Sequence, residues 1–179
     1  APVTAMPEAG QPMRAEAVQE PFDHPDWVFE VKWDGYRAIA EVREGSVSLY
    51  SRNGISFDKK FHPVVESLRK IGFNAVLDGE IVVVDDQGRP DFQLLQHYQA
   101  AGRGHLLYCV FDLLHFRGHD LTGLPLVRRK DLLKKILPSG PRLRYSDHVG
   151  KEGVLFYNVA REKGLEGIIA KHSQSAYEA

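Results

Sequence analysis

The strand patterns limit what this chain can fold into more than any other feature does. Residues 27–42 (WVFEVKWDGYRAIAEV) alternate aromatic and β-branched side chains with charged ones, which is typical of strands with one buried face. Residues 106–116 (LLYCVFDLLHF) are almost continuously apolar and predict a central strand. Further strands are expected at residues 46–52, 75–84 and 166–172, and turns at Glu44-Gly45, Asn53-Gly54 and Asp86-Gln87-Gly88.

Helical patterns separate these strands. Residues 125–138 (PLVRRKDLLKKILP) are amphipathic with a proline near each end, which makes this the clearest helix. Other helices are expected at residues 62–72, at residues 91–100 with Asp91 as N-cap, and at residues 154–164. Because there is no regular βαβ alternation, we expect an α+β fold with largely antiparallel sheets flanked by helices. Residues 1–20 lack a period and predict an irregular lead-in to one domain at residues 21–179.

Composition narrows the class of protein without naming a function. Hydrophobic residues make up 43% of the chain and its apolar runs are far too short to cross a bilayer, so no membrane partner is expected. The start shows no basic segment followed by an apolar one, so it does not predict a secretory signal. The single cysteine, Cys109, excludes an internal disulfide, and we expect it to be buried in a protein of the reducing cytoplasm.

Charge and metal-ligand spacing give mainly negative expectations. The net charge of -1 shows no nucleic-acid footprint, and the basic runs VRRKDLLKK and PRLRY are interpreted as solvated helix faces rather than binding patches. The eight histidines lack metal-ligand spacing, so no structural zinc is expected. There is no P-loop sequence, and phosphate binding must therefore depend on side chains and a metal ion.

Two segments carry candidate chemistry on their own residues. In KWDGYR, Lys32 ends a strand pattern and is followed by an Asp-Gly turn and Arg37. A second cation and partial desolvation would disfavour the ammonium form and allow nucleophilic attack, although a surface lysine fits the same pattern. In LDGEIVV, Asp78 and Glu80 point to one face of a strand and repel each other, which predicts a cation or hydroxyl donor beside them.

Five blocks occur in a fixed order: KWDGYR, SRNG, LDGEIVV, YCVFDLL and EGIIAK. Together they resemble the ordered motifs of ATP-dependent DNA ligases. The resemblance extends from about residue 12 to the last residue, and the motif sequences are most similar to those of the ligase domain of bacterial ligase D. The resemblance implies a nucleotidyltransferase (ATP-grasp-like) adenylation domain that uses ATP with Mg²⁺ or Mn²⁺. It also implies nicked or broken double-stranded DNA as substrate, with end-joining proteins and fused polymerase or nuclease domains as partners in the bacterial cytoplasm.

The resemblance assigns a role to each matching position. Lys32 is the residue that becomes adenylated, Glu30 contacts the adenine amino group, and Val31 belongs to the nucleotide site. The other assignments are Arg37 and Arg52 to ribose or phosphate, Glu80 to ribose or metal, Phe111 to stacking on adenine, Glu166 to a divalent metal and Lys171 to the α-phosphate.

Without the resemblance, several of these residues have ordinary interpretations. Phe111 would be a core phenylalanine, Arg52 a hairpin residue, and Glu166 and Lys171 solvated charges. The last two are five positions apart and lie on opposite faces of a regular strand, so a shared pocket requires a twist, a bulge or a strand end.

The expected reaction begins with attack of Lys32 on the ATP α-phosphorus, giving lysyl-AMP and pyrophosphate. AMP then passes to a DNA 5′-phosphate, and the neighbouring 3′-hydroxyl displaces it. The family's further lysine-rich motif and OB-fold domain lie outside these 179 residues, so we expect the fragment to seal DNA poorly. Two alternatives stay open: a capping-type guanylyltransferase that uses GTP, and a non-catalytic module that binds nucleotide or repair proteins.

Overall fold

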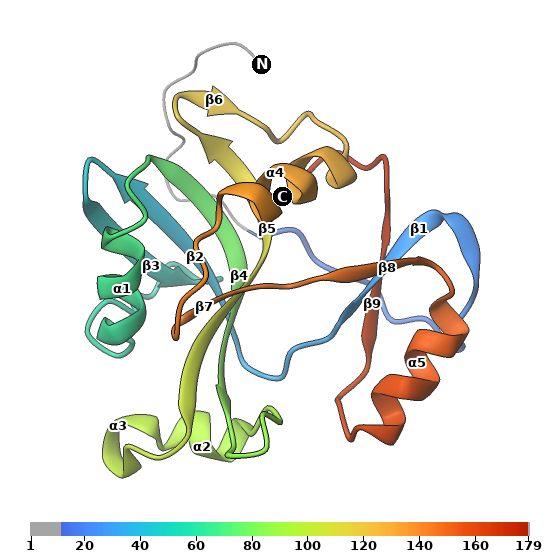
Figure 1. Cartoon of the computed structure of the whole chain (residues 1–179), viewed down its shortest axis with the longest axis horizontal. Coiled ribbons are helices and arrows are strands. Elements are labelled where there is room, and N and C mark those ends of the chain that lie inside the picture. Colours follow the sequence, from blue (N-terminus) through green and yellow to red (C-terminus); the bar gives the residue numbers. More distant parts are fainter. Residues whose placement is uncertain (1–11, 179) are drawn as a thin grey trace.

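The structure of the protein is a computed structural model that describes residues 12–178. Two largely antiparallel sheets form its body. The smaller sheet has the strand order β8 (His148–Lys151), β1 (His24–Val31), β9 (Ile168–His172). The larger sheet has the order β3 (Ser46–Ser51), β2 (Tyr36–Arg43), β4 (Ala75–Val84), β5 (His105–Phe116), β6 (His119–Asp120), and β7 (Leu143–Tyr145) pairs with β5 in parallel. Residues 32–35 connect β1 to β2, so Lys32 lies where the chain crosses between the sheets (Figure 1).

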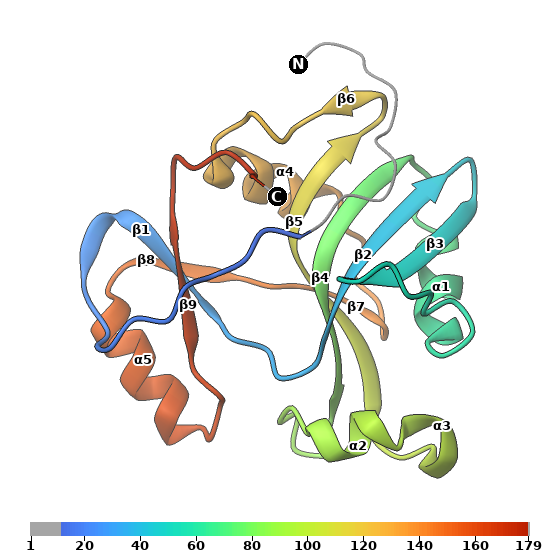
Figure 2. The ribbon, with the colours of Figure 1, turned by 180° about the vertical axis from the view of Figure 1, so that it is seen from behind.

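Helices pack at the outer faces of both sheets. In the larger sheet α1 lies against β3 and β5, α2 lies beside β4, and α4 packs on β5. In the smaller sheet α5 packs against all three strands, on the far side from the larger sheet (Figure 2). The helix bounds are α1 (His62–Arg69), α2 (Phe92–Gln96), α3 (Tyr98–Ala101), α4 (Leu126–Ile136) and α5 (Gly153–Glu162).

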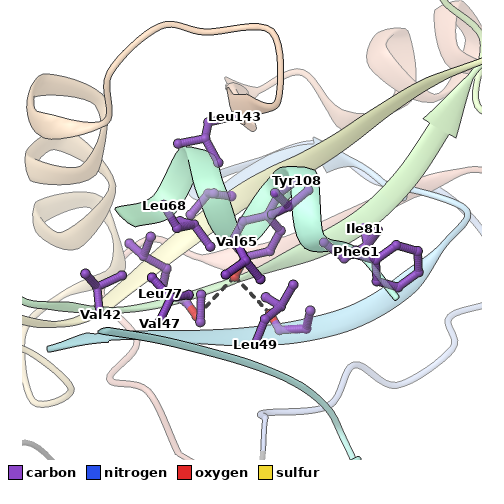
Figure 3. Close-up of a cluster of buried hydrophobic side chains, with 14 of the residues drawn as sticks. Val42, Val47, Leu49, Phe61, Val65, Leu68, Leu77, Ile81, Tyr108 and Leu143 are labelled. Carbon is purple, nitrogen blue, oxygen red and sulfur yellow. Dashed lines mark hydrogen bonds between the residues drawn. The ribbon is translucent and has the colours of Figure 1, made fainter. Parts of the chain in front are cut away.

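The main core lies between α1 and the larger sheet. The helix begins with a proline in its first turn and buries Val64, Val65 and Leu68 at helical spacing. Figure 3 shows Val65 and Leu68 directed toward the strands. Tyr108 of β5 is fully buried there, and its hydroxyl lies 3.0 Å from the carbonyl oxygen of Ala38 and 3.2 Å from that of Leu77. The core therefore joins β2, β4 and β5 through packing and through this satisfied polar group.

The α+β fold with antiparallel sheets is confirmed, as are the predicted turns, the terminal strand and Asp91 as N-cap, whose side chain accepts from the Leu94 N–H at 3.0 Å. Cys109 is buried, as expected, and burial raises the pKa of its thiol to about 12. The single helix expected at residues 91–100 is wrong, because the backbone at His97 (φ -100°, ψ 8°) leaves helical geometry and separates α2 from α3.

Other differences concern connections rather than element types. The sequence did not predict β6, β7 or β8, nor the division of the strands into two sheets. Residues 12–20 contain no helix or strand, and residues 1–11 of the expected lead-in lie outside the described residues. None of the helices within residues 12–178 is long and apolar enough to cross a membrane.

Candidate active site at the junction of the two sheets

Lys32 is held at the junction by residues that are far away in the sequence. Its backbone N–H donates to the carbonyl oxygen of Gly167 at 3.0 Å, just before β9 begins. Its Nζ lies 2.5 Å from Oε1 of Glu166, and the two side chains are 50% and 39% exposed. The group in contact with this amine is a carboxylate, and the second cation of the motif, Arg37, is paired with Asp78. Pairing β1 with β9 thus places the Lys32 amine and an acidic group together.

Glu166 itself precedes β9, which begins at Ile168, whereas Lys171 lies within the strand. The alternation of a regular strand therefore does not separate these two side chains. This is the strand-end position that the spacing of the two residues required.

The glycines of the two Asp-Gly pairs allow close backbone approach at this junction. A Cβ on Gly35 would lie 2.0 Å from the carbonyl oxygen of Ile81 on β4. A Cβ on Gly79 would lie 2.5 Å from the Cys109 carbonyl oxygen and 2.6 Å from the Tyr108 ring. Real Cβ contacts are not that short, so glycine at both positions lets the Lys32 segment and β5 pack tightly against β4.

Asp78 on β4 holds Arg37 of β2 in a two-pronged ion pair. The carboxylate is fully buried, with Oδ1 at 2.6 Å from Nε and Oδ2 at 2.7 Å from Nη2 of Arg37. The Tyr177 hydroxyl also donates to Oδ2, at 2.6 Å. A cation or a hydroxyl donor was predicted beside the carboxylates of this strand, and Asp78 has both. Two parallel charge-assisted bonds restrict the orientation of the guanidinium.

Phe111 occupies a β-bulge in β5. Asp78 pairs with Asp112 and the next residue, Gly79, pairs with Val110, so Phe111 is the extra residue of its strand. Its ring has the Arg37 guanidinium carbon at 4.6 Å and the Lys171 Nζ at 4.3 Å from its centroid. The partly exposed ring is therefore part of the site rather than of the core, and it lies between strands in electropositive surroundings.

Lys171 reaches Phe111 while paired with a buried glutamate. Its Nζ lies 2.9 Å from Oε2 of Glu30, which is 2% exposed, and Lys130 of α4 lies 2.7 Å from Oε1 of the same carboxylate. Although burial acts to raise the pKa of Glu30, the charges of Lys171 and Lys130 lower it below its usual value. Both oxygens of Glu30 therefore contact lysines, and its contact with an adenine amino group remains a prediction.

Lys130 and Arg129 were missed at the sequence level. Within the basic run interpreted as a solvated helix face, Arg129 is 1% and Lys130 0% exposed, so that interpretation is wrong for both. Arg129 forms a two-pronged ion pair with Asp112, at 2.8 and 3.0 Å. The signal was present, because residues 129 and 130 follow Leu126 by three and four positions and share its buried helix face.

Arg52 stands apart from the other candidates. It lies just beyond the end of β3, in an exposed turn, rather than within the strand expected at residues 46–52. Among residues 12–178 it makes no hydrogen bond or ion pair with the other site residues. Val31 is the last residue of β1 and pairs with Ile168 of β9. The structure thus forms two contact groups, the Lys32–Glu166 pair and a set in which Phe111 contacts Arg37 and Lys171 while Lys171 pairs with Glu30.

The acidic groups Asp34, Glu80 and Glu166 influence one another. The pKa of Glu80 is raised to about 8, mainly by burial and also by the charges of Asp78, Glu166 and Asp34, against the opposing effect of Arg37. The pKa of Asp34 is also raised, by burial and then by Glu166. A carboxylate that ionises this reluctantly is common in functional sites, where a cation or a proton stabilises it.

This shift predicts a pH-dependent stability. Since the pKa of Glu80 is about 8 in the folded chain against 4.5 for the free group, the folded chain keeps a proton that the unfolded chain loses between these values. The free energy of unfolding should therefore decrease as pH rises from about 4.5 to about 8. Urea titrations without divalent cations should show a smaller decrease for Glu80→Gln. Equal pH dependence in both proteins would contradict the raised pKa.

Comparison with known proteins agrees with this geometry. Residues 11–179 match the family model described as ATP dependent DNA ligase domain. The chain is 37% identical over 178 residues to the multifunctional non-homologous end joining protein LigD of Pseudomonas aeruginosa, covering 97% of this chain and 21% of that protein. It is 31% identical over 169 residues to the SPbeta prophage-derived DNA ligase-like protein LigB of Bacillus subtilis, covering 93% of this chain and 62% of LigB.

Solved structures show the same fold. A mycobacterial DNA ligase D complexed with ATP and MES superimposes with a TM-score of 0.81 at 31% identity, covering 94% of this chain and 56% of that one. The Chlorella virus DNA ligase-adenylate has a TM-score of 0.68 at 16% identity, which supports the fold alone. The chain spans less than two thirds of the length of each of these proteins. A capping-type guanylyltransferase is not favoured, and the chain belongs to the ATP-dependent DNA ligase family as an adenylation domain.

Proposed function

We propose that Lys32 of this domain attacks ATP and carries AMP as a covalent adduct for DNA joining. The observation that supports this most is that β1 and β9, with the residues that flank them, carry two ion pairs, Lys32–Glu166 and Glu30–Lys171, and that Lys171 also contacts the Phe111 ring of the larger sheet. An amine, an acceptor for its proton, an aromatic surface and a cation are the groups that nucleotidyl transfer to lysine needs.

The reaction follows from these positions. The Lys32 nitrogen forms a bond to the α-phosphorus, and the bond from phosphorus to the bridging oxygen of pyrophosphate breaks. The amine must lose protons in this step, and Oε1 of Glu166, at 2.5 Å, is positioned to accept one. Lys171 and Arg37 stabilise the phosphate charge electrostatically, while Phe111 offers a face on which adenine can stack, and Glu30 and Val31 line the nucleotide site.

The acidic residues fit a magnesium or manganese ion that is shared with the substrate. Within residues 12–178 no cluster of three or more ligand side chains is arranged to hold a metal ion alone. Mg²⁺ usually takes one or two carboxylates together with substrate phosphates and water, and a cation beside Glu80 would stabilise the ionised form of this carboxylate, whose pKa is raised mainly by burial. Glu80 and Glu166 would hold the ion, which would offset charge on the phosphate oxygens.

The DNA step is proposed from the relatives. The Pseudomonas protein is described as a multifunctional non-homologous end joining protein. We therefore assign to this domain the transfer of AMP to a DNA 5′-phosphate at a nick or break, followed by displacement of AMP by a 3′-hydroxyl. Arg52, exposed at its turn, is available for ribose or phosphate. End-joining proteins and fused polymerase or nuclease domains are the partners we propose, in the bacterial cytoplasm.

Mass spectrometry after incubation with ATP and Mg²⁺ tests the first step. The expected result is a mass increase of one AMP on the peptide that contains Lys32, from α-labelled but not γ-labelled ATP, and none when a chelator removes the metal. Preferential labelling by GTP would instead support a guanylyltransferase. Nucleotide binding without a covalent adduct would overturn the proposal in favour of a non-catalytic module.

A further inference from the structure

Lys130 is a buried charge that the proposed reaction does not use directly. Its side chain is fully buried, and its Nζ lies 2.7 Å from Glu30 Oε1, 2.9 Å from the Ser146 carbonyl oxygen and 3.2 Å from the Phe111 carbonyl oxygen. The two carbonyl oxygens accept hydrogen bonds from the ammonium group, whereas Glu30 Oε1 is held as an ion pair without a hydrogen bond. A buried lysine costs free energy unless it is paired, so this arrangement calls for an explanation beyond packing.

Lys130 shares its carboxylate partner with Lys171. Glu30 is 2% exposed and takes Lys130 on one oxygen and Lys171 on the other, whereas the Lys171 side chain is 22% exposed. Two lysines and one glutamate leave this triad with a net charge of one positive unit. Because Lys171 is the member that reaches solvent, beside the Phe111 ring at 4.3 Å, the excess charge is presented there.

We infer that Lys130 is a positioning residue, which neutralises Glu30 from the core side so that Lys171 keeps its positive charge available for the nucleotide's α-phosphate. If Lys130 were neutral, Glu30 and Lys171 would form an isolated pair with no net charge. Both oxygens of Glu30 would then compete with a phosphate for the Lys171 ammonium. The inference rests on the proposed role of Lys171, and it adds a residue of α4 to the binding of the nucleotide.

The test compares AMP with adenosine, which differ by the α-phosphate alone and cannot release pyrophosphate. Calorimetric titration of both ligands at low ionic strength gives the ratio of the AMP affinity to the adenosine affinity. Contacts to adenine and ribose contribute equally to both affinities and therefore cancel in this ratio. For Lys130→Met, whose triad is neutral, we expect the AMP affinity to decrease about tenfold while the adenosine affinity stays within about twofold. A purely structural defect would weaken both ligands alike.

Two further variants separate charge from folding. Glu30→Gln/Lys130→Met restores one net positive charge and should recover the wild-type ratio, while Glu30→Gln alone, with two positive charges, should exceed it. If Lys130→Met does not fold, the affinity ratios of these two variants test the inference, because their triads carry one and two positive charges. The matched control is Lys134→Met, one helical turn further along α4, where the side chain is 58% exposed and the ratio should not change.

An affinity ratio that does not follow the charge of the triad would overturn the inference, even if ATP still labels Lys32. Conversely, the affinity ratio could follow the charge of the triad in a protein that ATP fails to label. That result would contradict the proposed function but support the inferred role of Lys130 in phosphate binding. The labelling and binding measurements therefore distinguish the two failures.

Discussion

Replacement of Lys32 by methionine is expected to abolish the AMP adduct, a loss of at least about a thousandfold in the rate of labelling. The reason is chemical, because the phosphoramidate bond needs an uncharged amine at this position and Lys32 is the amine that contacts Glu166. The measurement is α-labelled ATP incorporation after equal incubation, with mass spectrometry of the peptide that contains residue 32.

A second variant distinguishes nucleophile from charge. Lys32→Arg retains a cation that can pair with Glu166, but a guanidinium does not act as a nucleophile, so this variant should also stay unlabelled. The control is Lys163→Met, which removes an exposed lysine just after α5 and should label normally. Adduct formation by either Lys32 variant would show that another group accepts AMP.

Replacement of Asp112 by alanine should lower the free energy of unfolding by about 3–5 kcal/mol. Arg129 is 1% exposed, and the change removes the carboxylate that holds its guanidinium through two bonds, at 2.8 and 3.0 Å. An unpaired buried charge remains, which costs more than the ion pair itself contributes. Urea denaturation at neutral pH measures the effect.

An exposed ion pair provides the matched comparison. Glu66 of α1 pairs with Arg69 one turn away, and their side chains are 41% and 47% exposed. Glu66→Ala should therefore cost less than about 1 kcal/mol. The double variant Asp112→Ala/Arg129→Met should regain part of the lost stability, because it no longer buries an unpaired charge. If Asp112→Ala alone costs no more than Glu66→Ala, the carbonyl oxygens of Leu124 and Ser175 are sufficient partners for Arg129.

Local patterns were enough to predict β1 to β5, β9 and most helices, because these depend on side-chain periodicity over short stretches. Alternation predicted both β1 and β2, and helical spacing predicted α1, α4 and α5. The same local reasoning identified the repulsion between Asp78 and Glu80 and predicted a cation or a hydroxyl donor beside them, and Arg37 and Tyr177 provide both for Asp78. These conclusions needed no knowledge of residues distant in the chain, except for the identity of the donors.

The site itself depends on contacts between distant segments. Phe111 lies in an apolar run that predicts core, and only the unequal pairing of β4 with β5 makes it the extra residue of a bulge. Lys130 lies in a basic run, yet α4 docks with that side chain facing Glu30, and the free energy of pairing two lysines with one carboxylate is not visible in the sequence of the helix. Sequence spacing carries no information about such pairings.

What the sequence determined by itself is the type and order of most elements, together with an ordered set of motifs that resembles those of ATP-dependent DNA ligases. What only the tertiary structure decided is how β1 pairs with β9, which places Lys32 against Glu166 across 134 positions of chain. The physical reason is that periodicity reports which face of an element is buried, whereas the partner that covers this face is selected by packing and charge pairing over the whole fold.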